Sequence, residues 1–300
     1  MILESLLDEY LSFLRQARGL SARSVLRNGR FVRRLLTSLE KRERFDIRAL
    51  RPQDLDAFLQ SQGRKLSRRS MADVASALRS FLRYLSLRAL LPASMVDAVV
   101  GPKIYAQESL PQCLSPEEVG TFLAAIDTGT SIGRRDYALF CLMLSTGLRP
   151  GEAARLRLDD IHWKERLVHI RQTKTGRPRT VPFSPEAGAA LLRFLQLDRR
   201  HEAFPPELFL GLRCARGRPL DHPDVIYLRF RRYARLAGLR ADATPYSLRH
   251  TFAQNLLEGG ADFTTLQNLL GHASTGSVLI YAKVSLTALR EVADNDAEEM

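Results

Sequence analysis

The sequence predicts a mainly helical protein with one small antiparallel β-sheet. Three observations support this fold class. Apolar residues recur every three to four positions through most of the chain, as they do along one face of an α-helix. Polar and apolar residues alternate convincingly only in about residues 161–183, as in half-buried strands. The 300 residues, 45% of them hydrophobic, suffice for two domains with separate cores.

Residues 1–100 are predicted to form a compact bundle of helices. In residues 2–16 the apolar side chains lie on one stripe, and Ser21 is placed to cap a second helix. Proline is favoured in the first turn of a helix, so Pro52 indicates the start of a third. Ser67 is placed to cap a fourth.

A linker is predicted at about residues 101–112, where the apolar periodicity lapses and prolines interrupt the chain. Directly after it, Ser115 and Glu118 have the spacing of a capping box, in which two side chains bond backbone N–H groups at the start of a helix. A second domain is therefore expected to begin near residue 113.

The second domain is predicted to hold the sheet between helices. An apolar helix is expected to be buried and to end at Gly147. Three short alternating segments follow, and Lys174 lies at the tip of the last hairpin. From Ser184 onward, the periodicity again predicts helices, and the last ten residues include five acidic side chains.

The charge of the chain indicates a polyanionic partner, with nucleic acid the leading candidate. The formal net charge is +12, and the first 100 residues hold 19 basic against 10 acidic side chains. Cations at a helix N-terminus oppose the helix dipole unless an anion lies nearby, and a DNA phosphate is such an anion. The residues expected to contact DNA in this part are Arg23, Arg27, Lys65, Arg68 and Arg69.

Other composition features exclude several classes of protein. No apolar run reaches the ~18 residues that a membrane span needs, and the acidic start does not fit a signal peptide. Three widely spaced cysteines argue against a disulfide framework and against a thiolate zinc site. The sequence therefore predicts a cytoplasmic protein with no membrane partner.

Five short stretches carry the candidate catalytic residues. Taken alone, each has a structural explanation, such as a surface guanidinium, a solvated lysine, a helix-end histidine or a core aromatic ring. Together they suit metal-free phosphoryl transfer. Arginines stabilise the charge of a pentavalent phosphorane, a phenolate attacks, an ammonium protonates the leaving oxygen, and an imidazole holds a phosphate oxygen or moves a proton. The five residues are Arg149, Lys174, Arg249, His272 and Tyr281.

In their order and spacing, these stretches resemble the tyrosine recombinases, the lambda-integrase superfamily that includes phage integrases and bacterial Xer proteins. TGLRPGE resembles the family's first-arginine box and LRHTFA its second. LLGHAS, with Tyr281 nine residues after His272, resembles the closing histidine–tyrosine pair. In the first 100 residues, LSRRSMADVASALRSFLRYL resembles the final helix of the family's core-binding domain.

The resemblance implies an architecture and a set of roles. A helical core-binding domain at residues 1–100 and a catalytic domain at residues 113–284 would form a C-shaped clamp on DNA. The implied reaction is site-specific cleavage and rejoining of DNA strands through a 3′-phosphotyrosyl intermediate, in integration, excision or resolution. The implied roles are phosphate binding by Arg149 and Arg249, orientation of Arg149 by Glu152, general acid catalysis by Lys174, phosphate hydrogen bonding by His272, and nucleophilic attack by Tyr281.

One position departs from the family pattern. Three residues before the second arginine the family usually has histidine, whereas this chain has Tyr246. A tyrosine donates a neutral hydrogen bond to phosphate but is no imidazole near neutral pH. Tyr246 is therefore expected to contribute less, with more of the proton handling left to Lys174 and His272.

The resemblance also implies partners. The tyrosyl ester conserves the energy of the phosphodiester, so no metal and no other cofactor is expected. The expected assembly is a homotetramer on double-stranded DNA with paired inverted half-sites, and a second recombinase or an accessory protein is left open. Residues 285–300 would comprise a helix passed to a neighbouring protomer, or folded back on its own, and an acidic tail.

Three other functions are weighed against this one. The first is a DNA-binding protein of the same fold without strand transfer, and the second is an enzyme like topoisomerase IB that nicks and reseals a single duplex. The third is a metal-dependent hydrolase that uses His250 and His272, which lack carboxylates at the spacing of a metal motif.

Overall fold

The structure is a computed structural model, and it describes residues 2–40, 46–102, 112–171, 178–199, 205–211, 220 and 223–271. The chain divides into two compact units, Met1–Glu108 and Ser109–Met300, and each is described by itself. The division falls inside the range expected to be a linker, most of which lies outside the described residues. The predicted fold class, mainly helical with a small antiparallel sheet, is confirmed.

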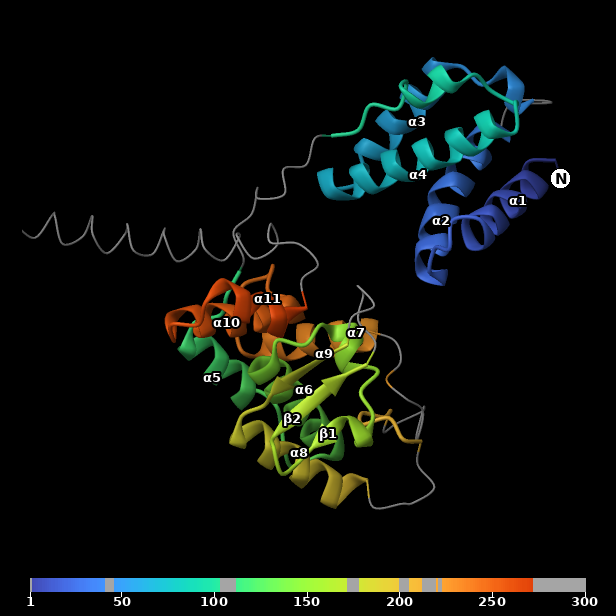
Figure 1. Cartoon of the computed structure of the whole chain (residues 1–300). Coiled ribbons are helices and arrows are strands. Elements are labelled where there is room, and N and C mark those ends of the chain that lie inside the picture. Colours follow the sequence, from blue (N-terminus) through green and yellow to red (C-terminus); the bar gives the residue numbers. More distant parts are fainter. Residues whose placement is uncertain are drawn as a thin grey trace, which may run out of the picture. The chain divides into compact units, whose positions relative to one another are not determined.

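The first unit is helical throughout its described part (Figure 1). Ser67 caps the fourth helix by accepting a hydrogen bond from the backbone N–H of Ser70, as predicted. Pro52 is the first residue of the third helix. The elements are α1 (Ile2–Gln16), α2 (Ala22–Glu40), η1 (Ile47–Ala49), α3 (Pro52–Gly63), α4 (Arg68–Leu87) and η2 (Ala93–Val96).

The core of the first unit lies where α1 and α2 pack and where α2 meets α4. Tyr10 of α1 is fully buried and lies edge-on to Phe81 of α4, with 5.1 Å between the ring centroids. The helices α1 and α2 approach closely at Gly29, where a Cβ atom would stand 2.8 Å from a methyl carbon of Leu11. The apolar faces predicted for these helices therefore meet in one core.

The second unit packs one face of a three-stranded antiparallel sheet against helices (Figure 1). The strand order is β1-β2-β3, with Val168 paired to Ile161 on one side and to Val181 on the other. The helices are α5 (Pro116–Ala124), α6 (Ser131–Thr146), α7 (Pro150–Ala153), η3 (Leu158–Asp160), α8 (Pro185–Asp198), α9 (Pro223–Leu236), α10 (Pro245–Glu258) and α11 (Phe263–Leu270). The strands are β1 (Ile161–His162), β2 (Leu167–Ile170) and β3 (Arg179–Pro182).

The helix α6 is the central element of the second unit, and it contacts α8 and α10. It ends at Gly147, whose φ of 62° is left-handed, so the predicted glycine cap is confirmed. The helix is less uniformly apolar than predicted, because it also buries Arg135 and Asp136. The Asp136 carboxylate accepts hydrogen bonds from Arg135, Arg229 and Tyr233, which satisfy its charge within the core.

Within the described ranges, no helix is long and apolar enough to cross a membrane. Several predicted features lie outside the described residues: the hairpin tip with Lys174, the segments with His272 and Tyr281, and residues 285–300.

Candidate active site

Arg149 is held at the junction between α6 and α7. The chain leaves α6 through Gly147, where a Cβ atom would stand 2.4 Å from a ring carbon of Phe252 on α10. Only glycine fits this left-handed position against the ring. Two residues later, Arg149 precedes Pro150, the first residue of α7, with extended backbone angles. The turn therefore carries Arg149 out of the buried end of α6, and 16% of the Arg149 side chain is exposed.

Arg249 reaches the same place from α10. Its residue is only 2% exposed, which requires that its charge be met by hydrogen bonds. Its Nη1 donates to the carbonyl of Gly147 at 2.5 Å, and its Nη2 donates to the carbonyl of Leu270 at 2.6 Å. The second arginine is thus bonded to the turn that positions the first.

Glu152 lies between guanidinium groups and is buried, with 3% of the residue exposed. It accepts hydrogen bonds from the backbone N–H of Arg149 at 2.9 Å and from its Nη1 at 2.7 Å. Burial acts to raise the pKa of Glu152, but hydrogen bonds and charge from Arg179, and then the backbone N–H and charge of Arg149, outweigh it and hold the pKa at about 2. Glu152 is therefore ionised throughout the neutral range.

Arg179 is the main residue of this cluster that the sequence analysis missed. It is the first residue of β3, and its Nη1 and Nη2 donate to the two carboxylate oxygens of Glu152 at 3.1 and 2.8 Å. A signal was present in the sequence, since side chains two apart on a strand share a face. Arg179 shares its face with the buried Val181, so it points toward the interior.

The last turn of α11 joins these arginines. Three successive backbone carbonyls at its C-terminal end each accept a hydrogen bond from a different guanidinium group. The carbonyl end of a helix carries partial negative charge, so it attracts cations. The pairs are Leu269 with Arg179 at 2.8 Å, Leu270 with Arg249 at 2.6 Å, and Gly271 with Arg149 at 3.4 Å. His272 is the next residue in the chain and lies just outside the described part.

The structure therefore brings together Arg149 and Glu152 from one stretch of sequence and Arg249 from another, about 100 residues later. Tyr246 lies in the first turn of α10, is 39% exposed, and places its ring 6.4 Å from that of Tyr227. Lys174, His272 and Tyr281 are outside the described residues.

His250, one residue after Arg249, has a shielded side chain. Burial, with the charge of Arg249 adding to it, lowers the pKa of His250 to about 4. Its imidazole is therefore neutral near pH 7. In the described ranges, no group of three or more histidine, cysteine or acidic side chains is placed to hold a metal ion.

The residues expected to contact DNA in the first unit are all exposed. They lie near the starts of α2 and α4, and Arg27 reaches Asp73 of α4 at 3.4 Å. Because α2 packs against α4, the two basic segments belong to neighbouring helices. These residues are Arg23, Arg27, Lys65, Arg68 and Arg69.

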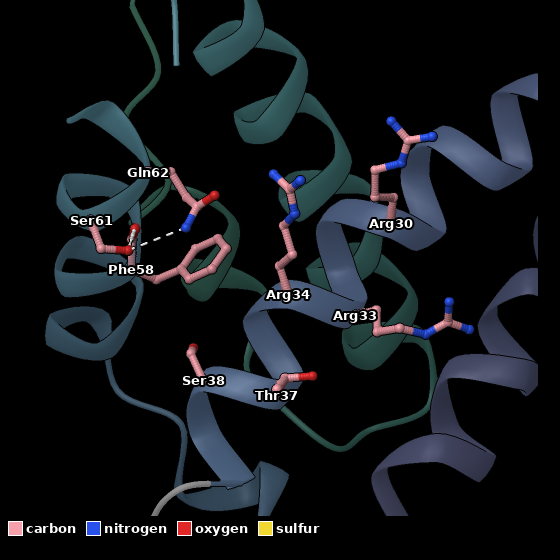
Figure 2. Close-up of a pocket in the computed structure, with 8 residues that line it drawn as sticks. All are labelled: Arg30, Arg33, Arg34, Thr37, Ser38, Phe58, Ser61 and Gln62. Carbon is pink, nitrogen blue, oxygen red and sulfur yellow. Dashed lines mark hydrogen bonds between the residues drawn. The ribbon is translucent and has the colours of Figure 1, made fainter. Parts of the chain in front are cut away.

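A second basic feature of the first unit is a cavity of about 470 Å³ between α2 and α3. Figure 2 shows Arg34 of α2 opposite Phe58 and Gln62 of α3, with Arg30 one turn away. Arg33, the third arginine of the lining, points away from α3 (Figure 2). All three arginines are exposed, and none of them forms an ion pair within the part of the chain that the structure describes.

The sequence matches known families over both units. Residues 112–287 match the Phage integrase family, and residues 7–89 match the phage integrase N-terminal SAM-like domain. Tyrosine recombinase XerC of Rhizobium meliloti is 36% identical over 95% of this chain and 90% of its own length. Tyrosine recombinase XerD of Listeria innocua is 31% identical over 97% of both chains.

Solved structures show the same fold. The XerH site-specific recombinase bound to palindromic difH substrate aligns with a TM-score of 0.74 at 22% identity, covering 96% of this chain and 84% of that one. A lambda integrase dimer bound to a core site aligns with a TM-score of 0.71 at 19% identity, covering 93% and 94%.

Proposed function

This chain belongs to the phage integrase family of tyrosine recombinases, and from that membership and the arginine cluster we propose how it cuts DNA. It is a site-specific recombinase that cleaves and rejoins DNA strands. In the proposed reaction, Arg149 and Arg249 bind the non-bridging oxygens of the scissile phosphate. The observation that carries this proposal is that both guanidinium groups are fixed on one turn of α11, directly before His272.

The charge of this cluster suits a phosphorane. Arg149, Arg179 and Arg249 contribute three positive charges and Glu152 one negative charge, so the described cluster carries a net charge of +2. Fixed donors that face developing negative charge stabilise a transition state without reorganising during the reaction. The cluster therefore has the charge that a strand-cleaving enzyme needs without a metal ion.

The remaining steps rest on residues that the family resemblance assigns. Tyr281 gives its proton to water and attacks the phosphorus, the bond to the 5′ oxygen breaks, and Lys174 protonates that oxygen. A 3′-phosphotyrosyl ester results, with His272 hydrogen-bonded to the phosphate. The 5′-hydroxyl of a partner strand then attacks the ester, rejoins the DNA and releases the tyrosine. Tyr246 adds at most a neutral hydrogen bond to the phosphate.

The proposed substrate is double-stranded DNA with two inverted half-sites, bound by four protomers. The palindromic substrate of the related XerH recombinase supports paired half-sites, and the names of the XerC and XerD relatives support a role in recombination between specific sites. We propose that residues 285–300 supply the contact that links one protomer to the next, and that the chain acts on DNA in the cytoplasm.

The first unit is proposed to bind the duplex through its basic helices. Arg23 and Arg27 begin a row on α2 that Arg30 and Arg34 continue, since residues three and four apart lie on one face of a helix. Guanidinium groups grip phosphate oxygens in pairs, and their charge does not titrate in the working range. The cavity in Figure 2 lies on this row, and it supports additional phosphate contacts by Arg30 and Arg34.

Trapping the covalent intermediate tests this function. Duplexes selected by binding to the protein are nicked near the cleavage point, so that the cut fragment diffuses away and the protein–DNA adduct persists on a denaturing gel. We expect an adduct with the wild type and none with Tyr281→Phe, while DNA affinity stays within about threefold. Tyr137→Phe, on α6, serves as the control and should form the adduct.

An adduct that persists in Tyr281→Phe would contradict the assigned nucleophile. Relaxation of a supercoiled plasmid that lacks paired sites would instead favour nicking and resealing of a single duplex. Binding without any adduct in the wild type would favour a DNA-binding protein without strand transfer.

A further inference from the structure

We propose that Arg179 is a positioning residue for strand cleavage, which neutralises Glu152 so that the charge of Arg149 remains available to the phosphate. The inference rests on the proposed function, because it takes Arg149 to be a phosphate ligand. Nothing in the family matches or in the catalytic roles assigned above gives Arg179 a part in the reaction. Its own contacts assign it.

Arg179 is directed inward by its place on β3. Only 7% of its side chain is exposed. Nη1 and Nη2 donate to the two oxygens of Glu152 at 3.1 and 2.8 Å, and Nε donates to the carbonyl of Leu269 at 2.8 Å. All three nitrogens therefore donate to protein oxygens, and two of them donate to the negatively charged carboxylate of Glu152. In Arg249, by contrast, Nη1 and Nη2 donate to neutral backbone carbonyls.

The carboxylate of Glu152 has two guanidinium partners, and this sharing decides the charge of the site. With Arg179 present, the pair of arginines and the carboxylate sum to one positive charge. Without Arg179, Glu152 would cancel the charge of Arg149, because the Nη1–Oε1 distance is only 2.7 Å. The same carboxylate accepts a hydrogen bond from the backbone N–H of Arg149 and so holds that residue in place. Glu152 thus positions Arg149, whereas Arg179 preserves the positive charge of Arg149.

Arg179 also lies against the end of α11. Gly271 ends this helix in a left-handed conformation with a φ of 60°, and a Cβ atom there would stand 2.9 Å from Nη1 of Arg179. The absence of a side chain at Gly271 lets the guanidinium reach Glu152 beneath the helix end. Arg179 thus links β3 to α11. β3 begins five residues after Lys174, and α11 ends just before His272.

A charge-restoring pair of variants tests the proposal. Arg179→Met lowers the net charge of the described cluster from +2 to +1, whereas Arg179→Met combined with Glu152→Gln returns it to +2. In single-turnover cleavage of the nicked duplex, we expect Arg179→Met to be slower by about 100-fold, the size of effect seen when one stabilising group is lost. We expect the double variant to cleave about tenfold faster than Arg179→Met, with DNA affinity within about threefold of wild type for both.

Neutralising Glu152 would also relieve an uncompensated buried charge, so the urea unfolding midpoint of each variant is measured beside its cleavage rate. A role in charge predicts that the loss and the rescue persist under conditions in which all the variants are fully folded. Arg193→Met, which removes an exposed arginine from α8, is the control for loss of one positive charge and should cleave at the wild-type rate. A double variant as slow as Arg179→Met, or slower, would overturn the proposal. So would an unimpaired Arg179→Met.

Arg179→Lys keeps the test decisive if the methionine variant does not fold. It retains the charge but loses the paired hydrogen bonds, so we expect a loss of no more than about fivefold. A cleavage rate 100-fold below wild type in Arg179→Lys would overturn the proposal that Arg179 acts by neutralising Glu152. If Tyr281→Phe still forms the adduct, the proposed function itself fails. Failure of the Arg179 variants alone leaves that function standing and removes only the inference.

Discussion

Glu152 is a buried carboxylate at a place where the proposed chemistry requires positive charge. It accepts four hydrogen bonds from the backbone and side chain of Arg149 and from the side chain of Arg179. Removing one partner from such a buried network costs more than the net worth of the lost bond, because the remaining groups stay unsatisfied in a low dielectric. Glu152 therefore links local stability to the geometry of the site.

The pH dependence of stability tests this link. The pKa of Glu152 is about 2 in the folded state and lies below the ordinary value of 4.5, so the unfolded state takes up the proton first as pH falls. The stability that Glu152 contributes is present above pH 4.5 and declines below it. We expect the free energy of unfolding of the wild type, relative to Glu152→Gln, to fall by about 2 kcal/mol between pH 6 and pH 3.

Trp163, the single tryptophan of the chain, reports on this unfolding. It lies in the turn between β1 and β2, edge-on to Phe183, within the second unit. Its fluorescence in urea therefore follows the second unit separately from the first. Equal pH dependence of the wild type and Glu152→Gln would contradict the ionised state assigned to this carboxyl group.

At the scale of elements, α11 is an eight-residue helix whose two ends have different tasks. The side chain of Asp262 caps its start by accepting a hydrogen bond from the backbone N–H of Thr265 at 2.5 Å. Its end offers three carbonyls to Arg149, Arg179 and Arg249. A helix this short depends on caps and packing, because nucleation costs more than its few hydrogen bonds return.

Loss of the α11 cap is expected to reach the active site. Asp262→Ala should lower stability by about 1 kcal/mol, as cap removals do, and should slow single-turnover cleavage severalfold because the helix end frays. Hydrogen exchange of the α11 amides measures the fraying. Ser184→Ala removes the cap of α8 at a similar cost, but α8 holds none of the three arginines, so its cleavage rate should be unchanged. Equal slowing in both variants would mean that the effect is general destabilisation.

Helices and strands were predictable where a periodic apolar face or a cap lies within a few residues. The Ser115–Glu118 capping box, the Gly147 cap and the three alternating strands are all local signals, and the structure contains each of them. The burial of polar side chains on α6 was not predictable in this way, because Arg229, one partner of Asp136, lies 93 residues away in sequence. Arg179 was not predicted for the same reason, because its proposed role depends on hydrogen bonds to Glu152, which lies 27 residues earlier in the chain.

At the scale of the whole molecule, we expect the charge of the first unit to govern DNA affinity. Neutralising each phosphate releases counterions, so the logarithm of the affinity falls with the logarithm of salt concentration by about 0.9 per contact. We expect a steep dependence in the wild type. In the double variant Arg30→Ala, Arg34→Ala we expect the slope to be smaller by about 2.

Arg88→Ala is the matched control for this measurement. Arg88 donates to Glu9 at 2.6 Å, so its charge is already compensated within the first unit, and its removal should leave the slope unchanged. Fluorescence anisotropy with labelled duplex at several salt concentrations gives the slopes. An unchanged slope in the Arg30, Arg34 variant would exclude the cavity between α2 and α3 from the DNA-binding surface.

The three carbonyls at the end of α11 have a thermodynamic consequence for association with DNA. Arg149 and Arg249 are already immobilised by the fold, so their rotamer entropy, up to about 2 kcal/mol for each such side chain, is lost during folding. Association with a duplex does not incur that penalty again. A preorganised receptor of this kind therefore retains more of its contact energy as net affinity.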